Sequence, residues 1–308
     1  MTSLEAVSTY LPPTVPVTDL RESLGLSDQQ VRRFTRLYGL NGICQAPGES
    51  ETDLLLAAAG KLAILAGQEH RVRYLIRAKG LRTTAPYPVS PLLQVREKLG
   101  LRHAQPLAVA DHGCATGLLA IDVAGTLLAA DGDPEALALV VAGDKTFTRF
   151  SQWVEDVSIM GEGVVAVLVG SGARDRVLGY EALIIGREDG VIDLDADGAR
   201  EAKRIYQDAI AEVIAKALDA AGTTVDGLRL VLPHNVNRVS WTVAAKNLGI
   251  PRERVFLDNI ERTGHCFCAD PFINYRSACD LGLLKPGDRY LMTSAGLGQS
   301  FAAMVLEH

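Results

Sequence analysis

The sequence lacks a surplus of positive charge. Its 31 lysines and arginines stand against 37 aspartates and glutamates, which gives a formal net charge of −6 at pH 7. Nucleic acid and anionic lipid headgroups would therefore meet an unfavourable overall field. We expect no nucleic-acid partner and no attachment to a membrane surface.

Long uninterrupted hydrophobic runs are also missing. The two most apolar stretches, 54–65 and 115–130, contain Lys61 and Asp122 and are shorter than the roughly 20 apolar residues of a membrane-spanning helix. Residues 1–10 carry an acid and no basic segment ahead of a hydrophobic stretch, which is not the layout of a secretory signal. We expect no transmembrane helix and a cytoplasmic protein.

Cysteine is scarce, with five residues in 308. An odd number without an export signal favours reduced thiols, and a chain of this length needs no disulfides to build a core. Hydrophobic residues make up 48% and charged residues 22%, which is typical of a compact globular protein and excludes extended disorder. One of the five thiols could therefore carry chemistry.

Short apolar runs alternate with helical patterns, which indicates an α/β protein. The runs are continuous and do not alternate with polar residues, as in sheets that are covered on both faces. The expected strands are Leu107–Ala110, Leu137–Ala142, Val164–Val169, Leu228–Leu232, Arg289–Met292 and Ala302–Leu306.

Three helices are predicted from the same pattern. Residues 200–221 form an amphipathic helix that packs on a sheet. Ser50, with Asp53 three residues later, caps a Leu/Ala-rich helix that runs to Gly67. The helix that starts near Cys114 is apolar almost all round, so it is buried in the middle of the molecule. We expect two closely packed α/β halves that meet within residues 175–198.

Cys114 stands where an apolar strand gives way to the buried helix. The N–H groups at a helix N-terminus stabilise a thiolate, the nucleophilic form of cysteine. Gly113 and Gly117 allow close approach of a substrate and of a neighbouring backbone. An isolated cysteine is most often a small buried hydrophobe, but the strand–Gly–Cys–helix context favours a nucleophile.

Two histidines stand in segments that resemble sites. His234 directly follows a predicted strand, and His265 lies in a glycine-containing loop. Each alone is more often a structural residue than a catalytic one. Together with Cys114 they are more persuasive, because ligand sites in α/β proteins collect at the ends of strands along one sheet edge.

Three other motifs suggest a function by their letters, but the residues around them do not fit that function. Residues 161–166 match a dinucleotide fingerprint by letters but precede a strand instead of following one. Cys266 and Cys268, with His265 and Cys279, lack the spacing of a structural zinc site, so no metal is expected. The residues around Cys114 do not carry the local signature of a papain-like protease.

Several segments, taken in order, resemble the β-ketoacyl-acyl-carrier-protein synthase III family, and the resemblance extends over nearly the whole chain. They are Gly-Cys-Ala-Thr-Gly at 113–117, Val-Ala-Gly-Asp at 141–144, Met-Gly-Glu-Gly at 160–163, Pro-His-Asn-Val-Asn at 233–237, Gly-His-Cys-Phe at 264–267, and the stretch 285–298 that ends in Ser-Ala-Gly-Leu-Gly.

The resemblance implies the thiolase fold, a duplicated five-layered α-β-α-β-α sandwich that usually forms a homodimer. Residues 1–175 would form the half that carries the nucleophilic cysteine, and residues 176–308 the half that carries the catalytic histidines. It also implies an acyltransferase that uses no cofactor apart from its thioester substrates.

The site residues follow from the same resemblance. Cys114 would take the acyl group, His234 would assist in loading it, and His265 would complete the triad and govern the acceptor step. The backbone N–H groups of Cys114 and Leu297 would form the oxyanion hole. Tyr87 would shape the acyl pocket of the partner subunit.

The chain departs from the family at informative positions. His265 stands where the family has asparagine, as in chain-elongating ketosynthases. Arg32 replaces a tryptophan that stacks on the adenine of coenzyme A, whereas Arg36 is retained and could bind a phosphate of coenzyme A or of a phosphopantetheine arm. We therefore expect acyl carrier protein as a donor alongside coenzyme A thioesters.

Three functions remain open on this sequence. The first, which the sequence favours over the two alternatives, is decarboxylative Claisen condensation of an acyl thioester with a malonyl-type carrier thioester, in specialised metabolism resembling polyketide or fatty-acid biosynthesis. The second is acyl transfer to a hydroxyl, amine or carrier thiol without a new carbon–carbon bond. The third is a non-catalytic thiolase-fold dimer partner, against which the retention of Cys114 and His234 argues.

Overall fold

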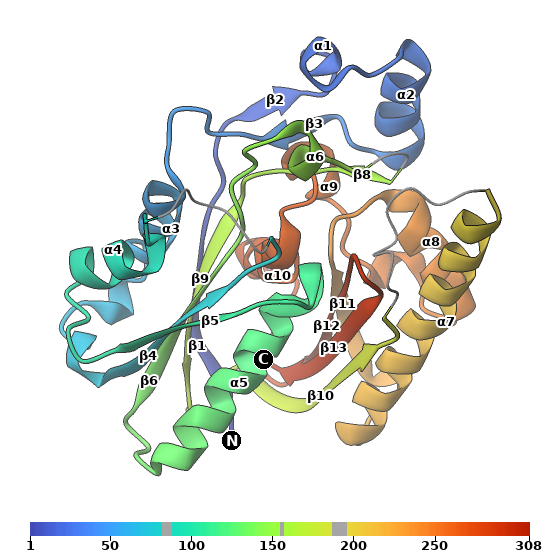
Figure 1. The fold of residues 1–308 in the computed structure, drawn as a ribbon. Helices are drawn as coiled ribbons and strands as arrows, with labels where there is room; N and C mark the ends of the chain where they lie inside the picture. Colours follow the sequence, from blue (N-terminus) through green and yellow to red (C-terminus); the bar gives the residue numbers. More distant parts are fainter. Residues whose placement is uncertain (82–87, 155–156, 187–195) are drawn as a thin grey trace.

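The computed structural model describes residues 1–81, 88–154, 157–186 and 196–308. Its main sheet runs in the order β11-β12-β13-β10-β1-β9-β6-β4-β5 (Figure 1). These strands are β1 (Ser3–Tyr10), β4 (Val72–Ala78), β5 (Gln105–Val109), β6 (Leu137–Ala142), β9 (Val164–Gly170), β10 (Arg176–Ile184), β11 (Leu228–Pro233), β12 (Arg289–Gly296) and β13 (Ser300–Glu307).

The sheet consists of two groups of strands. β1, β4, β5, β6 and β9 come from the first 175 residues, and β10 to β13 come from the rest of the chain. The groups join where Ser3 of β1 pairs with Arg176 of β10. The strands thus divide at the residue where the two halves were expected to meet, but whether each half is a domain of its own stays a prediction.

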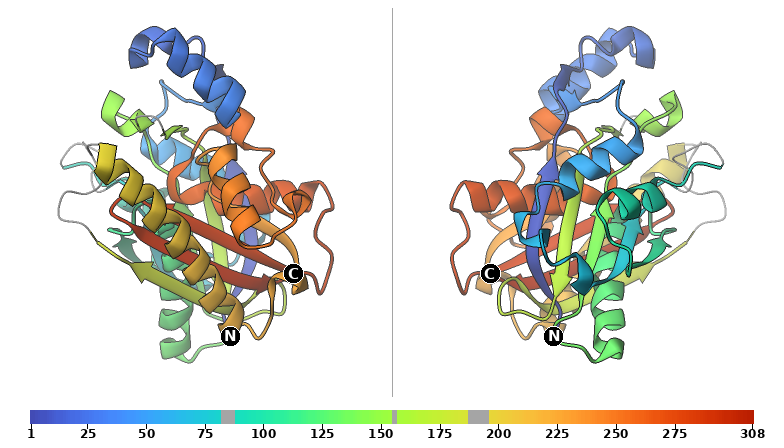
Figure 2. Two further views of the ribbon diagram at one scale, coloured as in Figure 1. Left: turned by 90° about the vertical axis from the view of Figure 1, so that its right-hand side faces the viewer. Right: turned by 90° about the vertical axis from the view of Figure 1, so that its left-hand side faces the viewer.

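Helices cover both outer faces and fill the space between the two groups. α3 (Glu51–Ala59) and α4 (Pro91–Lys98) cover the first group, whereas α7 (Ala196–Ala220) and α8 (Arg238–Asn247) cover the second. α5 (Thr116–Asp131) and α10 (Asp270–Asp280) contact strands of both groups (Figures 1 and 2). The expected five-layered α-β-α-β-α architecture is therefore confirmed.

Short elements complete the fold around the upper part of Figure 1. A π-helical turn over Arg33–Tyr38 continues α2. The remaining strands and helices are β2 (Thr14–Pro16), β3 (Gly42–Cys44), β7 (Trp153–Val154), β8 (Ser158–Ile159), α1 (Arg21–Leu24), α2 (Asp28–Arg32), α6 (Arg149–Gln152) and α9 (Ile260–Thr263).

The Leu/Ala-rich helix begins as predicted and ends early. The Ser50 hydroxyl accepts a hydrogen bond from the Asp53 N–H, and the Asp53 carboxylate accepts one from the Ser50 N–H at 3.0 Å. The helix stops at Ala59 instead of continuing to Gly67, and a 3₁₀ turn follows at Ala63–Leu65. Gly60 explains the difference, because glycine loses more backbone entropy in a helix than any other residue.

The apolar stretch expected at 115–130 forms the buried helix α5 (Thr116–Asp131). The segment Gly113–Asp131 has the length and apolar composition of a membrane span. In the fold, however, α5 lies in the middle of the molecule, where Leu118, Ile121 and Ala124 are buried in the core between the two groups of strands. Its all-round hydrophobicity therefore reflects contact with both groups.

Candidate active site

Cys114 lies in the tight connection between β5 and α5. Asp111 and Gly113 both have positive φ values, 70° and 49°, which turn the chain sharply after the strand. The turn Gly113–Ala115 then leads directly into α5. Cys114 is 8% exposed. The predicted placement between a strand and the start of the buried helix is confirmed.

The loop after β12 contacts the backbone of this turn. A Cβ atom on Gly296 would lie 2.9 Å from the amide nitrogen of Cys114, and one on Gly113 would lie 3.1 Å from that of Leu297. The Ser294 hydroxyl also donates a hydrogen bond to the Cys114 carbonyl at 2.7 Å. Two glycines thus bring the N–H groups of Cys114 and Leu297 close together, as an oxyanion hole requires. The role itself stays a prediction.

His265 is the histidine that contacts Cys114. Its Nε2 atom lies 3.1 Å from the Cys114 Sγ atom, and its Nδ1 atom is hydrogen-bonded to the Asp270 carboxylate. The backbone of His265 is held by Ile159 and Gly161, which form hydrogen bonds of 3.0 and 2.9 Å with its N–H and C=O groups. Three residues therefore form a Cys–His–Asp chain of contacts.

The charges around His265 favour its protonated form. Burial by itself would lower the pKa of this imidazole, but the negative charges of Cys114 and Asp270 outweigh burial and raise the pKa to about 10. An imidazolium beside the sulfur stabilises a thiolate. The nucleophile expected from the sequence is thus paired with a cation.

His234 lies beside this chain of contacts and outside it. Its ring centroid is 5.5 Å from that of His265, and its Nε2 atom is 3.4 Å from the Tyr206 hydroxyl. No hydrogen bond joins His234 to Cys114 within the part of the chain that the structure describes. Burial and the positive charge of His265 hold the pKa of His234 well below its usual value. The structure therefore places His265, and not His234, against Cys114, and the assisting role of His234 stays a prediction.

Asp270 is a site residue that the sequence reasoning missed. It is fully buried at the first turn of α10 and accepts hydrogen bonds from the N–H groups of Asn235 and Cys266 at 2.6 and 2.8 Å. The Asn235 side chain donates to it at 3.2 Å and accepts one from Asn274 at 2.8 Å. The sequence does contain a signal for this residue, which is an acidic side chain five residues after His265 at the start of a helix.

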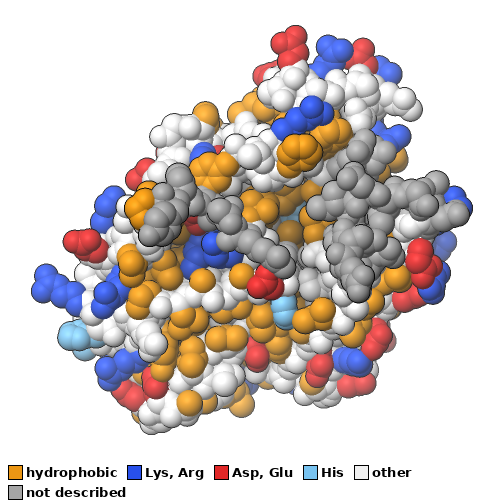
Figure 3. Space-filling model, in the orientation of Figure 1, with side chains coloured by type: hydrophobic (Ala, Val, Ile, Leu, Met, Phe, Trp, Pro, Cys, Tyr) orange, Lys and Arg blue, Asp and Glu red, His pale blue; other side chains and the backbone are white. Residues whose placement is uncertain are grey.

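Of the two predicted binding residues, the structure describes only Arg36. Tyr87 lies outside the described residues. Arg36 is exposed on the π-helical turn that continues α2. Figure 3 shows a hollow on this face of the molecule, with hydrophobic and histidine side chains inside it. Phosphate binding by Arg36 stays a prediction.

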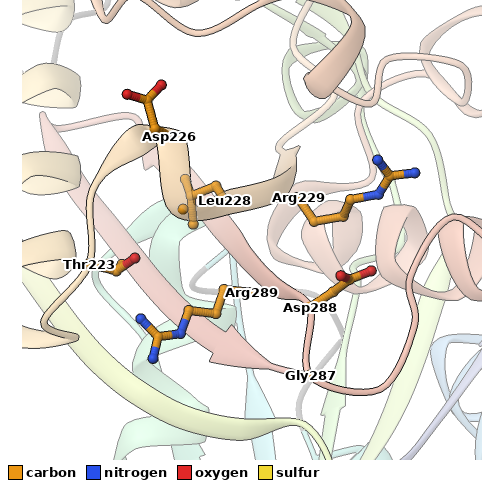
Figure 4. A pocket seen from close by; sticks show the side chains of 8 residues that line it. Thr223, Asp226, Leu228, Arg229, Gly287, Asp288 and Arg289 are labelled. Atoms are coloured by element: carbon orange, nitrogen blue, oxygen red, sulfur yellow. The ribbon is translucent and has the colours of Figure 1, made fainter.

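Two further features of the described residues were compared with the site, namely possible metal-binding groups and a surface pocket. No cluster of three or more histidine, cysteine or acidic side chains with metal-binding geometry occurs in the described residues. A solvent-open pocket of about 450 Å³ contains Arg229, Asp288 and Arg289 (Figure 4). It lies where β11 and β12 begin, whereas His234 follows the end of β11. That pocket is therefore remote from the cysteine.

The comparisons with known proteins agree with the fold and the motifs. Residues 218–308 match the family model described as 3-oxoacyl-[acyl-carrier-protein] synthase III C terminal. The whole chain is similar to the β-ketoacyl-[acyl-carrier-protein] synthase III of Coxiella burnetii, with 24% identity over 99% of this chain and 98% of that protein.

Two solved structures have a fold similar to that of this protein. The acyltransferase ChlB3 superposes with a TM-score of 0.87 and 22% identity, covering 99% of this chain and 97% of its own. The 3-oxoacyl-[acyl-carrier-protein] synthase III of Aquifex aeolicus superposes with a TM-score of 0.81 and 22% identity, covering both chains completely. The protein has the thiolase fold, and its similarity to β-ketoacyl-acyl-carrier-protein synthase III extends over nearly the whole chain. The resemblance and the broad acyltransferase class are confirmed.

Proposed function

We propose that the protein transfers an acyl group from a thioester to a nucleophile through an acyl thioester on Cys114, without forming a carbon–carbon bond. The observation that carries this proposal is the contact chain from Cys114 through His265 to Asp270. Such a chain accepts and returns a proton while the cysteine acts as nucleophile. This was the second of the functions left open by the sequence.

Loading uses the thiolate–imidazolium pair. The Cys114 sulfur attacks the carbonyl carbon of the donor thioester, and the N–H groups of Cys114 and Leu297 stabilise the oxyanion that forms. When the intermediate collapses, the carbon–sulfur bond to the donor breaks. The departing thiolate takes the Nε2 proton of His265 and leaves as a thiol. The products are acyl-Cys114 and a neutral His265.

The acceptor step uses the base that loading creates. Asp270 holds the remaining imidazole proton on Nδ1, so Nε2 of neutral His265 presents a lone pair. It takes a proton from an acceptor hydroxyl, amine or thiol, while the acceptor atom attacks the acyl carbon. Collapse of the second intermediate releases the product and restores the thiolate–imidazolium pair.

Decarboxylative condensation is the second candidate, and the closeness of His234 and His265 favours it. That reaction requires N–H groups that donate to the enolate of a malonyl thioester. After loading, His265 has no such group free, because Nε2 is bare and Nδ1 donates to Asp270. The Asp270 contact therefore supports acyl transfer over condensation.

The donor follows from the names of the relatives and from the sequence. The similar curated protein is named as a synthase that acts on acyl carrier protein, and we propose acyl carrier protein or coenzyme A thioesters as donors here, with Arg36 near the phosphates. Intact-mass analysis after mixing with both kinds of thioester tests this directly. A mass increase equal to the acyl group is expected. No adduct with any donor would indicate the non-catalytic partner instead.

The variant His265→Asn separates the two reactions. Asparagine donates a hydrogen bond to an enolate but does not take a proton, so acyl transfer should fall by about 10²-fold or more. His265→Ala should lose transfer to a similar extent and should also load more slowly, because the imidazolium is lost. Carbon–carbon bond formation that persists in His265→Asn would overturn the proposal in favour of condensation.

A further inference from the structure

The Tyr206 hydroxyl lies against His234, and the steps above give this contact no role. The sequence places Tyr206 on the packing face of the amphipathic helix, which the structure shows as α7. Its hydroxyl oxygen is 3.4 Å from Nε2 of His234. The tyrosine ring also meets the rings of His234 and Phe301 edge-on, with centroids 6.4 and 6.0 Å apart. A phenol is thus directed at the outer nitrogen of the second histidine.

Both groups keep their neutral forms. Burial and the charge of His265 lower the pKa of His234, so its imidazole carries a single proton. Burial raises the pKa of Tyr206 well above its ordinary value, so the phenol keeps its proton although the side chain retains some exposed surface. The question is which imidazole nitrogen bears the hydrogen, because that decides whether Nε2 donates or accepts.

Counting donors and acceptors favours the proton on Nδ1. If Nε2 carried it, Nε2 would donate to the phenol oxygen, and both the tyrosine proton and the Nδ1 lone pair would lack partners within the described residues. With the proton on Nδ1, the Tyr206 hydroxyl donates to Nε2, and only the Nδ1 proton lacks a hydrogen bond of normal geometry. Buried polar groups without hydrogen-bond partners destabilise a protein, so the arrangement with the proton on Nδ1 is favoured.

We propose that Tyr206 is a positioning residue that keeps the His234 proton on Nδ1 and leaves Nε2 as a hydrogen-bond acceptor. The consequence for catalysis rests on the proposed function: with Nε2 of His265 also bare after loading, neither histidine offers an Nε2–H group to a malonyl enolate. Tyr206 thereby selects acyl transfer over decarboxylation. The tautomer itself does not depend on which reaction the enzyme performs.

Nitrogen NMR of protein labelled with ¹⁵N-histidine tests the tautomer. The His234 signals are assigned by their loss in His234→Gln, and Nε2 is distinguished from Nδ1 because it couples to both ring protons. We expect a bare Nε2 and a protonated Nδ1 in the wild type, with Tyr206→Phe shifting the proton toward Nε2. A protonated Nε2 in the wild type, or spectra unchanged by Tyr206→Phe, would overturn the proposal.

A kinetic ratio tests the consequence. Tyr206→Phe should raise the ratio of malonyl-thioester decarboxylation to acyl transfer by at least about tenfold. Tyr180→Phe is the matched control, because the Tyr180 hydroxyl on β10 is buried and has no hydrogen-bond partner within the described residues. It should leave the ratio and the His234 spectra unchanged. An equal change in both variants would mean that Tyr206 is merely structural. If the wild type transfers no acyl group, the proposed function fails, while the spectra still decide the tautomer.

Discussion

At the scale of single residues, the site depends on buried charges that compensate one another. Asp270 is fully buried, and it is satisfied by two backbone N–H groups, by the Asn235 amide and by His265. A carboxylate held in this way keeps an adjacent imidazole protonated and oriented. The protonation of His265, and with it the reactivity of Cys114, should therefore depend on Asp270.

Asp270→Asn tests this dependence through pH. The imidazolium of His265 should persist until the pH rises through about 10 and be lost above that value. Without the Asp270 charge, the pKa of His265 should fall, so acylation of Cys114 should decline at a lower pH, and turnover should drop by about 10²-fold or more. Single-turnover acylation measured against pH reports both effects.

Asp280→Asn is the matched control, because Asp280 is exposed, ends the same helix and pairs with half-buried Arg276. It should retain the wild-type pH profile. An Asp270→Asn enzyme with an unshifted profile would show that Asp270 does not set the protonation of His265.

We expect Cys114 to be the only acylated cysteine. Burial is the main cause that raises the pKa of Cys266, Cys268 and Cys279, so their thiols stay protonated at neutral pH. Peptide mapping of the loaded protein should place the acyl group on Cys114, and Cys266→Ser should still load. An adduct on Cys266 that forms in Cys114→Ala would contradict this assignment.

At the scale of elements, the site depends on contact between two turns. The connection from β5 to α5 and the loop after β12 approach closely because Gly113 and Gly296 have no side chains. A Cβ atom on Gly296 would lie 2.3 Å from the His112 carbonyl oxygen and 2.9 Å from the Cys114 nitrogen. The backbone cannot accommodate such contacts without moving.

Gly296→Ala should therefore separate the two N–H groups of the expected oxyanion hole. We expect the rate of Cys114 acylation to fall by about 10²-fold or more, which is typical for loss of an oxyanion donor. Gly48→Ala is the control, because a Cβ atom there meets nothing within 4 Å. Rapid-quench acylation followed by mass spectrometry measures both variants. If Gly296→Ala is acylated at the wild-type rate, the N–H group of Leu297 does not belong to the oxyanion hole.

At the scale of the whole molecule, the main sheet leaves an edge strand. β5 ends the sheet among the described strands, and the turn that carries Cys114 follows it directly. Exposed sheet edges readily pair with another chain. A dimer formed along this edge would place the partner beside the catalytic turn, in keeping with the homodimer that the resemblance implies.

We predict a homodimer that is required for full activity. Light scattering should give twice the mass of the chain, and dilution below the dimer dissociation constant should reduce turnover.

Tyr87→Ala should alter the preferred acyl length if this residue shapes the partner's pocket. A fully active monomer would contradict both expectations.

Much of the architecture could be predicted from the sequence because it depends on local patterns. The strands at 137–142 and 164–170 and the cap of α3 follow from neighbouring residues. The strands β1, β4 and β10 were not predicted, and β1 owes its conformation to pairing with β9. The end of α3 was predicted too late, because Gly60 ends the helix although the apolar pattern continues beyond it.

The sequence by itself determined the candidate nucleophile, since the position of Cys114 between a strand and a helix is a property of adjacent residues. Only the tertiary structure decided which histidine lies next to it. His265 is 151 residues away along the chain, and its contact with Cys114 depends on how two loops from opposite halves meet. The partners Asp270 and Tyr206 were hidden for the same reason, because side-chain distances of a few ångströms are set by the packing of α10 and α7 against the sheet.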